Sequence, residues 1–498
     1  MDRNKAITLL LDRAEQKELF LPEDRYYIAN LLLCVLELDG YESDGEYPSG
    51  QALDDGLHWL LDDACKRGVV DGSTSGREKL QSAILGCLTP RPSEVQRLFW
   101  EKYRNSPHEA TNWFVDLCRD VGDIHIGRDR RWKVPTEYGE LEISINLSKP
   151  EKDPLEVAVQ ARTAQTGYPK CRLCLENEGY AGRPGYPARQ NHRVIPITLA
   201  GEPWGFQYSP YVYYNEHCIA MNAAHTPMKI DEHTFEKLFA FLKLFPHYFI
   251  GSNAELPIVG GSILGHEHYQ GGRYSFAMER APVETELQFP GYGEVYAGIV
   301  KWPVSVLRLR GTEEAPLIHL AGQILRAWRQ YSDPSITLYA KTNGIYHNTI
   351  TPIARRRGEE FELDLVLRNN LTTQEFPLGL FHPHPEYHHI KRENIGLIEV
   401  MGLAILPSRL QGEMEALIDT VLTSGDLRAR ECTAKHADWM ESILTGSSYK
   451  EAYSLEKLLK WEIGKVFLKV LENTGVFKRD GKGKQAFLRF ASYAAQNR

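Results

Sequence analysis

The sequence of 498 residues predicts an α+β protein with helical segments at both ends and a mixed middle. Apolar residues recur at spacings of three and four through residues 1 to about 130, and again from about residue 408. Between these regions, short runs typical of strands alternate with helical stretches, without the regular rhythm of a parallel sheet. The chain is also too long for one simple core, so we expect two or more domains.

Composition narrows the class of protein further. A hydrophobic content of 42% and a charged content of 25% are typical of a soluble globular chain. The net charge of −8 argues against nucleic acid as a partner, so a phosphate-bearing ligand would need a local cationic patch. The most apolar run, residues 238–250, contains Lys, Pro and His and is too short to cross a bilayer. The N-terminal segment carries both signs of charge, unlike a secretory signal. We therefore expect a cytoplasmic protein without a membrane partner.

Helical spacing defines the first region. Residues 26–40 and 56–68 show it most clearly, and each helix is expected to end at the glycine that closes the segment. Residues 77–88 and 93–106 continue the pattern. Residues 1–135 are therefore predicted to form an all-α extension, and nothing in them suggests chemistry.

The middle of the chain begins with a predicted strand over residues 139–147, where Leu141, Ile143, Ile145 and Leu147 alternate with polar residues. A loop rich in lysine and proline follows it. The further predicted elements are strands at 210–222, 305–311, 335–341 and 360–370, and helices at 231–245, 317–332, 408–422 and 454–475. We expect four regions: 1–135, 136–290, 291–410 and 411–498.

The stretch GGSILGHEHYQGG, residues 260–272, places His266, His268 and Gln270 at alternate positions between two pairs of glycines. In an extended segment these three side chains face one way, and Glu267 and Tyr269 face the other. Glycines allow the backbone to approach a ligand closely. Two imidazoles and an amide beside such a loop suit phosphate chemistry. The alternative is a histidine-containing strand on a wet sheet face.

A second motif, CRLCLENEG at 171–179, holds Cys171 and Cys174 as a C-x2-C pair. Such a pair in a cytosolic chain can bind a metal, but structural zinc needs four ligands, and a chance pairing is the alternative. His225 and His266 are candidates for the other two ligands, and His192 and His217 are harder to place. If His266 is a ligand, the metal anchors the strand that presents His268.

A third stretch, FHPHPEYHHIKREN at 381–394, holds four histidines, but glutamate stands where the first motif has glutamine and no glycine loop precedes it. Its prolines and polar residues predict a loop. We expect it to contribute Lys391 or Arg392 to a substrate site rather than a nucleophile.

Four segments together carry a family resemblance: residues 138–154, 168–174, 251–272 and 395–407. Over about residues 135 to 410 the chain resembles the second class of galactose-1-phosphate uridylyltransferases, in the transferase branch of the histidine-triad superfamily. The resemblance implies a histidine-triad-like antiparallel sheet core flanked by helices. It also implies a UDP-glucose–hexose-1-phosphate uridylyltransferase of galactose metabolism, which acts on UDP-sugars and hexose 1-phosphates.

By motif match with the first class of that family, the resemblance implies His268 as the nucleophile, with Gln270 holding the phosphoryl oxygens. It implies a structural zinc held by Cys171, Cys174, His225 and His266. The substrate-binding positions are Asn253, Gly260, Gly261 and Ser262, and the cationic side chains proposed for the phosphates are those of Lys149, Lys152, Lys391 and Arg392. A homodimer is an option that the sequence leaves open.

Three departures from the first class stand out. The nucleophile motif has Glu267 where the first class has proline. The first class also has an iron site on an L-H-A-H strand, but the matching segment here offers Asp364 and Val366, so iron is not supported. A glutamate of that class's substrate loop matches Glu399 only with a spacing that is off by one.

Uridylyl transfer between two sugar phosphates is nearly isoenergetic, so it needs a covalent carrier rather than an energy source. An imidazole can attack the α-phosphorus, and the departing sugar phosphate, whose last pKa is about 6, needs no strong general acid. A neutral glutamine therefore suffices at position 270. The alternatives are a dinucleoside polyphosphate phosphorylase or another nucleotidyltransferase on the same fold, and a non-catalytic zinc-stabilised binding protein.

Overall fold

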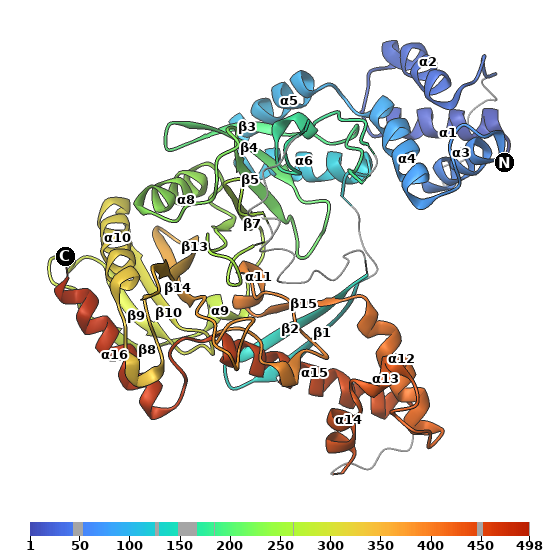
Figure 1. Ribbon diagram of the computed structural model, residues 1–498. Coiled ribbons are helices and arrows are strands. Elements are labelled where there is room, and N and C mark those ends of the chain that lie inside the picture. The colour runs from blue at the N-terminus through green and yellow to red at the C-terminus, as the bar shows by residue number, and fades with distance from the viewer. Residues whose placement is uncertain are drawn as a thin grey trace.

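The structure is a computed structural model that describes residues 1–42, 53–124, 129–147, 167–183, 185–261, 263–445 and 452–497. Figure 1 shows helices gathered at the two ends of the chain and a broad sheet between them. The strands of that sheet come from both halves of the middle region, and helices cover it. The prediction of an α+β fold is confirmed.

The N-terminal extension is helical, as predicted. Its α-helices are α1 (Arg3–Gln16), α2 (Arg25–Leu36), α3 (Leu53–Arg67), α4 (Thr74–Leu88), α5 (Pro92–Asn105) and α6 (Pro107–Asp120). Helix α3 ends just before Gly68, as predicted, and Gly68 takes the left-handed conformation with a φ of +80°. Helix α2 ends earlier than expected, because Glu37 takes the left-handed conformation with φ 51° and Gly40 plays no part in the cap.

One large antiparallel sheet forms the centre of the molecule, in the order β3-β4-β5-β7-β6-β13-β14-β10-β9-β8. Its strands are β3 (Ile195–Leu199), β4 (Glu202–Tyr208), β5 (Cys218–Asn222), β6 (Phe249–Gly251), β7 (His268–Gly272), β8 (Val283–Leu287), β9 (Tyr296–Val300), β10 (Val306–Gly311), β13 (Asn348–Arg357) and β14 (Glu360–Asn369). Strand β7 lies between β5 and β6, so neighbours on both sides fix its backbone.

Helices cover one face of this sheet. They are α8 (Glu232–Leu244), α10 (Glu314–Gln330) and α16 (Gly481–Gln496). Helix α8 begins at a capping box, in which Asp231 accepts from the Thr234 N–H and Thr234 bonds back to the Asp231 N–H. Its buried side chains join those of β4 and β13 in the largest hydrophobic core. This layer holds the sheet rigid from behind.

A second, smaller sheet lies over the other face (Figure 1). Its strands are β1 (Arg130–Thr136), β2 (Gly139–Asn146) and β15 (Leu403–Pro407), and β2 pairs with β15 in parallel. The helices around it are α9 (Ala277–Arg280), α11 (Leu397–Val400), α12 (Arg409–Leu422), α13 (Glu431–Ala434), α14 (Ala437–Leu444) and α15 (Ala452–Thr474). This arrangement places the chain just before β15 opposite β7.

Two predicted strands are wrong or too long. Within 210–222 only β5 is a strand, because hydrogen bonds from Tyr213 N–H to Tyr211 O and from His217 N–H to Tyr214 O close successive turns. Residues 335–341 are also not a strand. Pro334–Ile336 form a 3-10 turn that Asp333 caps, and only a short β11 (Lys341–Thr342), paired with β12 (Ile345–Tyr346), follows.

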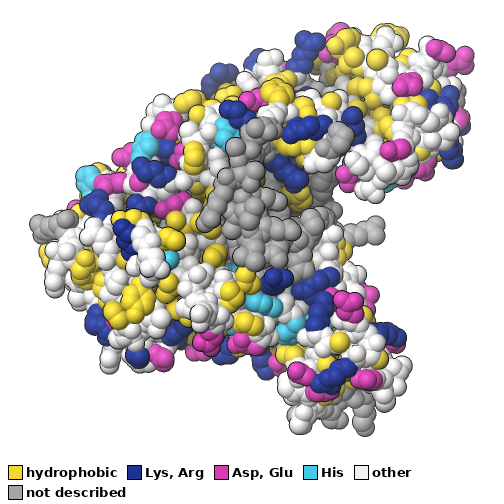
Figure 2. All heavy atoms as spheres, in the orientation of Figure 1, with side chains coloured by type: hydrophobic (Ala, Val, Ile, Leu, Met, Phe, Trp, Pro, Cys, Tyr) yellow, Lys and Arg dark blue, Asp and Glu magenta, His cyan; other side chains and the backbone are white. Residues whose placement is uncertain are grey.

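The division into four regions stays a prediction, and β8, which precedes the boundary at 290, pairs with β9 beyond it. Within the described residues, no helix combines the length and the apolar character that crossing a bilayer requires. On the face seen in Figure 2, basic and acidic side chains are interspersed.

Candidate active site

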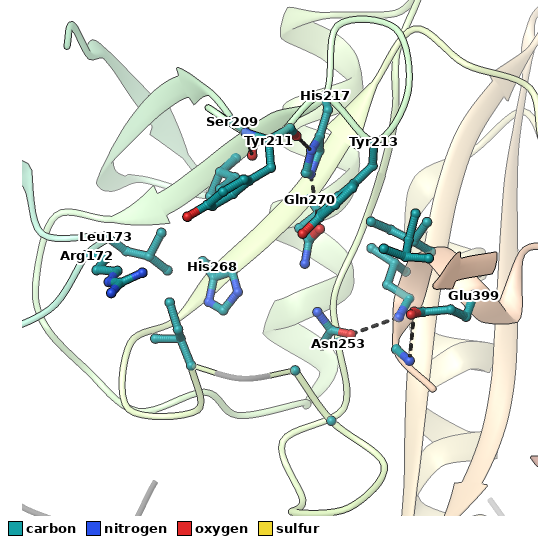
Figure 3. A pocket seen from close by; sticks show the side chains of 18 of the residues that line it. Arg172, Leu173, Ser209, Tyr211, Tyr213, His217, Asn253, His268, Gln270 and Glu399 are labelled. Atoms are coloured by element: carbon teal, nitrogen blue, oxygen red, sulfur yellow. Dashed lines mark hydrogen bonds between the residues drawn. The ribbon is translucent and has the colours of Figure 1, made fainter. Parts of the chain in front are cut away.

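A cavity of about 290 Å³ opens between β7, the loop before β5 and the segment that leads to α11. Figure 3 shows Arg172, Leu173 and Tyr211 toward one end and Glu399 toward the other, with His268 and Gln270 between them. The lining also includes Arg189, Gln207, Ser209, Pro210, Tyr213, His217, Ile219, Asn253, Gly260, Gly261, Ile263, Lys391, Glu393, Asn394, Gly396, Leu397, Ile398 and Ile405. Most of the predicted site residues that the structure describes therefore meet in one place.

His268 is the first residue of β7, and its side chain is only 6% exposed. The ring Nδ1–H donates a hydrogen bond of 2.7 Å to the carbonyl oxygen of His266, which leaves Nε2 without a proton in the neutral ring. Burial lowers the pKa of His268 to about 4. The imidazole is therefore neutral near pH 7 and directs a lone pair into the cavity.

Gln270 follows two residues later and points to the same side, because side chains alternate along a strand. Its Oε1 lies 3.2 Å from Nε2 of His217, which comes from the loop before β5. On the opposite face, Tyr269 stacks on Trp204 with ring centroids 4.8 Å apart, and its hydroxyl donates to Glu267. The predicted alternation is confirmed for residues 268–270. His266 lies before the strand, outside the lining of this cavity, and belongs to the cluster of cysteines and histidines described below.

Glu267, which stands where the first class has proline, is held by hydrogen bonds. Its carboxylate accepts hydrogen bonds from Lys237 Nζ at 2.9 Å, from Asn222 Nδ2 at 2.9 Å and from the Tyr269 hydroxyl at 2.9 Å. The carboxylate is buried on the far side of the sheet from the cavity. Three partners from three elements therefore hold the backbone between the two histidines in place.

The two glycine pairs are required by the packing of the chain against itself. A Cβ on Gly260 would lie 2.3 Å from the Ala254 carbonyl oxygen, and one on Gly261 would lie 2.8 Å from Nδ2 of Asn253. A Cβ on Gly271 would lie 2.5 Å from the Phe249 carbonyl oxygen. At Gly260 and Gly271 the neighbouring atom is a backbone carbonyl oxygen, so these glycines allow close packing of β7 against β6 and of the loop at 260 against the chain at 254.

The four predicted metal ligands, Cys171, Cys174, His225 and His266, form one cluster. The Sγ atoms of Cys171 and Cys174 are 3.6 Å apart, and each lies 3.1 Å from a histidine Nδ1, that of His266 and that of His225 respectively. All four ligand atoms lie within 4.8 Å of one another. The hydrogen bond from the Cys171 thiol lowers the pKa of Cys174, and the same contact together with burial raises the pKa of Cys171.

The geometry of this cluster fits a tetrahedral metal. Zinc bonds to sulfur at about 2.3 Å and to nitrogen at about 2.0 Å, which sets ligand atoms roughly 3.3 to 3.8 Å apart. The Nε2–H of His266 donates to the Asn222 carbonyl oxygen at 2.7 Å, which turns the Nδ1 lone pair toward the two sulfurs. These four side chains can bind a metal ion.

The other two histidines considered for this cluster have different partners. His192 bonds to Asp123 and Gln207. His217 bonds to the Tyr211 carbonyl oxygen and to Gln270.

Asn253 and Lys391 lie in the cavity wall. Oδ1 of Asn253 accepts from the Leu397 N–H at 2.8 Å, so the amide nitrogen is free to face the cavity. Lys391 is 1% exposed, and its ammonium group donates to Glu393, Glu399 and the Ile405 carbonyl oxygen at 2.9 to 3.1 Å. All three of its hydrogens are therefore used, and the two carboxylates outweigh its charge.

Arg392 is exposed and is not among the described residues that line this cavity. Lys149, Lys152 and Ser262 lie outside the described residues.

Sequence reasoning missed several residues of the cavity wall. Arg172 is inside the C-x2-C motif and is an exposed cationic residue of the cavity lining, unlike the buried and paired Lys391. Its place between two candidate metal ligands is a signal that could have identified it. Tyr211 and Tyr213 belong to the segment that was predicted as a strand, and as a loop they both face the cavity with their rings 6.3 Å apart.

Residues 381–394 form a loop with one turn of 3-10 helix, as expected. His382 is buried and bonds to Asn394, and His384 bonds to the Leu380 carbonyl oxygen and to Asn473. Within the described chain, neither imidazole is part of the cavity lining. The hydrogen bonds of these histidines stabilise the loop. The loop contributes Lys391, Glu393 and Asn394 to the cavity wall.

The position that corresponds to the iron site of the first class holds ion pairs. Both carboxylate oxygens of buried Asp364 bond to Arg308, at 2.7 and 2.9 Å, and one of them also bonds to Arg355 at 2.8 Å. Burial acts to raise the pKa of Asp364, but these two guanidinium groups lower it. Val366 offers no ligand atom, and the cationic partners of Asp364 do not fit a metal site.

Comparison with known proteins gives consistent results along the chain. Family models match residues 64–227, as "Galactose-1-phosphate uridyl transferase, N-terminal domain", and residues 241–441, as the C-terminal domain of the same family. The galactose-1-phosphate uridylyltransferase of Clostridium acetobutylicum is 47% identical over 495 residues, which cover 98% of this chain and 99% of that protein. The protein of the same name from Ligilactobacillus salivarius is 46% identical, over 98% of both chains.

A relative from Caldanaerobacter subterraneus is 50% identical over 88% of this chain and 87% of its own. Among solved structures, yeast Ap4A phosphorylase Apa2 aligns over 65% of this chain and 92% of its own, with 10% identity and a TM-score of 0.36, too distant to bear on function. The resemblance stated from the motifs is confirmed by the family models and the close relatives. The chain belongs to the galactose-1-phosphate uridylyltransferase family.

Proposed function

We propose that this protein transfers a uridylyl group from UDP-glucose to galactose 1-phosphate, with His268 as the covalent carrier. The enzyme class follows from family membership. One observation supports the role of His268: a neutral imidazole, with its Nδ1–H held by the His266 carbonyl oxygen, presents a free Nε2 to the cavity. Such a nitrogen is a nucleophile that needs no separate base.

In the first half-reaction, the Nε2 lone pair attacks the α-phosphorus of UDP-glucose, and the bond from that phosphorus to the bridging oxygen breaks. Glucose 1-phosphate leaves with the bonding electrons, and the uridylyl group stays on Nε2. The hydrogen bond from Nδ1 to His266 stabilises the positive charge that the ring gains. The departing phosphate needs no proton because its last pKa is about 6.

In the second half-reaction, a phosphate oxygen of galactose 1-phosphate attacks the same phosphorus from the side that glucose 1-phosphate left. The bond to Nε2 breaks, the imidazole regains its lone pair, and UDP-galactose forms. Gln270 and Asn253 direct amide groups at the region where the phosphoryl oxygens would lie, and Arg172 supplies positive charge. Two half-reactions at one nitrogen give ping-pong kinetics.

The cluster of Cys171, Cys174, His225 and His266 is proposed to hold zinc, whose role would be structural. Such an ion would tie the loop that carries Arg172 and Leu173 to the backbone just before His268. The substrates in this proposal are UDP-sugars and hexose 1-phosphates, and the environment is the cytoplasm. A homodimer is the proposed assembly.

Labelling tests this proposal. The protein, incubated with uridine-labelled UDP-glucose alone, should become labelled through a phosphoramidate that is labile to acid and stable to base. His268→Asn should abolish labelling and turnover, whereas His384→Asn, from the loop of four histidines, should keep both. Labelled enzyme should yield UDP-galactose with galactose 1-phosphate and should not transfer the label to inorganic phosphate. Labelling of the His268 variant, or loss of label only in the His384 variant, would move the nucleophile to residues 381–394.

A further inference from the structure

His217 lies behind Gln270 in a position that constrains the protons of both side chains. It is 4% exposed and follows the turn that the loop makes at Tyr214. Its Nδ1 lies 2.8 Å from the Tyr211 carbonyl oxygen, and its Nε2 lies 3.2 Å from Oε1 of Gln270 (Figure 3). Both neighbours are carbonyl oxygens, which only accept hydrogen bonds. The ring can satisfy both of them only when both nitrogens carry a proton.

The surroundings of His217 disfavour that doubly protonated ring. Burial lowers the pKa of His217 to about 4, so near pH 7 the ring keeps one proton, and the bond to Tyr211 places it on Nδ1. The Nε2 lone pair would then face the lone pairs of Gln270 Oε1. Turning the NH2 group of Gln270 toward His217 would relieve this conflict, but it would also turn Oε1 into the cavity.

A carbonyl oxygen in the cavity would oppose the negatively charged oxygens of a phosphoryl group. With His217 protonated, Oε1 accepts from Nε2–H and both N–H bonds of Gln270 point away from His217, toward the cavity. A bound pyrophosphate would favour this second arrangement in two ways. Its oxygens would accept hydrogen bonds from the Gln270 amide, and its negative charge would attract the positive charge of the His217 imidazolium.

The groups next to His217 carry little charge that would compete with a bound anion. The rings of Tyr213 and Tyr214 lie 5.3 and 4.7 Å from the imidazole, and Tyr211 offers only its carbonyl oxygen. The adjacent Glu216 directs its carboxylate to Tyr248 and Arg273. A substrate anion would therefore be a strong new charge beside this ring.

We propose that His217 is a positioning residue that takes up a proton from solvent when the pyrophosphate of the substrate binds, and thereby fixes the Gln270 N–H groups toward the phosphoryl oxygens. The inference rests on the proposed function of the cavity and adds a coupling between substrate binding and proton uptake. A neutral glutamine can act as a donor to phosphate only if its orientation is set, and His217 sets it.

Calorimetry of UDP-glucose binding at pH 6 tests the proposal, in a His268→Asn background that stops uridylyl transfer and removes a second buried imidazole. UDP-glucose is suitable because its pyrophosphate has no terminal phosphate that titrates near pH 6. The binding enthalpy should change with the ionisation enthalpy of the buffer and report uptake of about half a proton or more per chain. With His217→Gln added, the enthalpy should no longer depend on the buffer, although glutamine can still donate to Gln270.

His382→Gln in the same background is the matched control, because His382 is another buried imidazole near the cavity whose pKa burial lowers to about 4. This control should keep the proton uptake. Equal uptake with and without His217, or no uptake while UDP-glucose binds, would overturn the proposal. A merely structural role would lower stability without changing the proton count. If the wild-type protein is not labelled by UDP-glucose, the proposed function fails as well, so the two failures can be told apart.

Discussion

The ammonium group of Lys237 lies 2.9 Å from the carboxylate of Glu267, on the face of β7 opposite His268. Both side chains are at least nine-tenths buried, and Lys237 also contacts Glu202 at 3.0 Å. Burial acts to lower the pKa of Lys237, but its bonds to Glu267 and Glu202 raise it, so the amine stays charged. The peptide between His266 and His268 is therefore fixed by an ion pair.

Replacing Lys237 with methionine should lower the free energy of unfolding by about 3 kcal/mol, because the Glu267 carboxylate would stay buried without its cation. Urea denaturation would measure this loss. Lys243→Met is the matched control on the same helix, since its pair with Glu314 is exposed, and it should change stability by less than about 0.5 kcal/mol. Equal effects of the two substitutions would show that the buried pair does not stabilise the strand.

Elemental analysis of protein purified without added metal should find about one zinc per chain, because four ligand atoms fit one tetrahedral ion. Cys174→Ser should lose the metal and melt at a lower temperature. Cys218→Ser, a buried cysteine of β5 outside the cluster, should keep it. A metal-free wild-type protein whose melting is unaffected by chelator would refute the zinc assignment.

Gln270→His should raise hydrolysis of UDP-glucose relative to transfer by about tenfold or more, because an imidazole at that position can exchange a proton with water near the phosphorus. Product analysis by chromatography would separate uridine monophosphate from UDP-galactose. Gln270→Met, which neither donates nor carries a proton, should slow transfer without any gain in hydrolysis. Wild-type ratios in the histidine variant would mean that Gln270 does not contact the phosphorus.

Stability should fall on acidification through a partly buried chain of hydrogen bonds in the C-terminal part. Nδ1 of His389 lies 2.8 Å from Nδ1 of His436, whose Nε2 lies 3.0 Å from Glu413, a carboxylate that also pairs with Arg409 and Lys435. Burial and the neighbouring His436 lower the pKa of His389 to about 3. The unfolded chain binds this proton near pH 6.5, so the contribution of neutral His389 is lost as the pH falls from about 6.5 toward 3.

His389→Gln should therefore reduce the difference in unfolding free energy between pH 7 and pH 5 by an amount on the order of 1–2 kcal/mol. Urea denaturation at the two pH values would measure it. His319→Gln, an exposed histidine of α10, should leave the difference unchanged. An unchanged pH dependence in the His389 variant would place the acid sensitivity elsewhere.

Local patterns were enough to predict the helices and the key strand. The spacing of apolar residues predicts α8 and α15, because each packs one face on a core, and the alternation predicts that His268 and Gln270 share the cavity, although His266 does not line it. The same alternation fails at residues 210–217. There, turn hydrogen bonds and the left-handed backbone of Glu216 outweigh the β propensity of the tyrosines.

The charged contacts of the cavity were harder to predict than the placement of His268 and Gln270. A lysine near a predicted phosphate site is expected to bind the phosphate. Lys391 instead donates hydrogen bonds to Glu393 and Glu399, which are two and eight residues away. Only the fold brings these groups together. The sequence around Glu267 also does not show how a glutamate can stand where the first class has proline. The carboxylate of Glu267 is bound by Lys237, which lies on helix α8.

The parallel pairing of β2 with β15 has a consequence for biosynthesis. Leu403 follows Asn146 by 257 residues, so during translation at about 5–20 residues per second β2 waits roughly 13–50 s for its partner. Residues 391–405, which form one wall of the cavity, are made only at the end of that interval. A nascent chain therefore contains the His268 strand before the opposite wall of the cavity has been made. An unfinished chain cannot form the complete cavity.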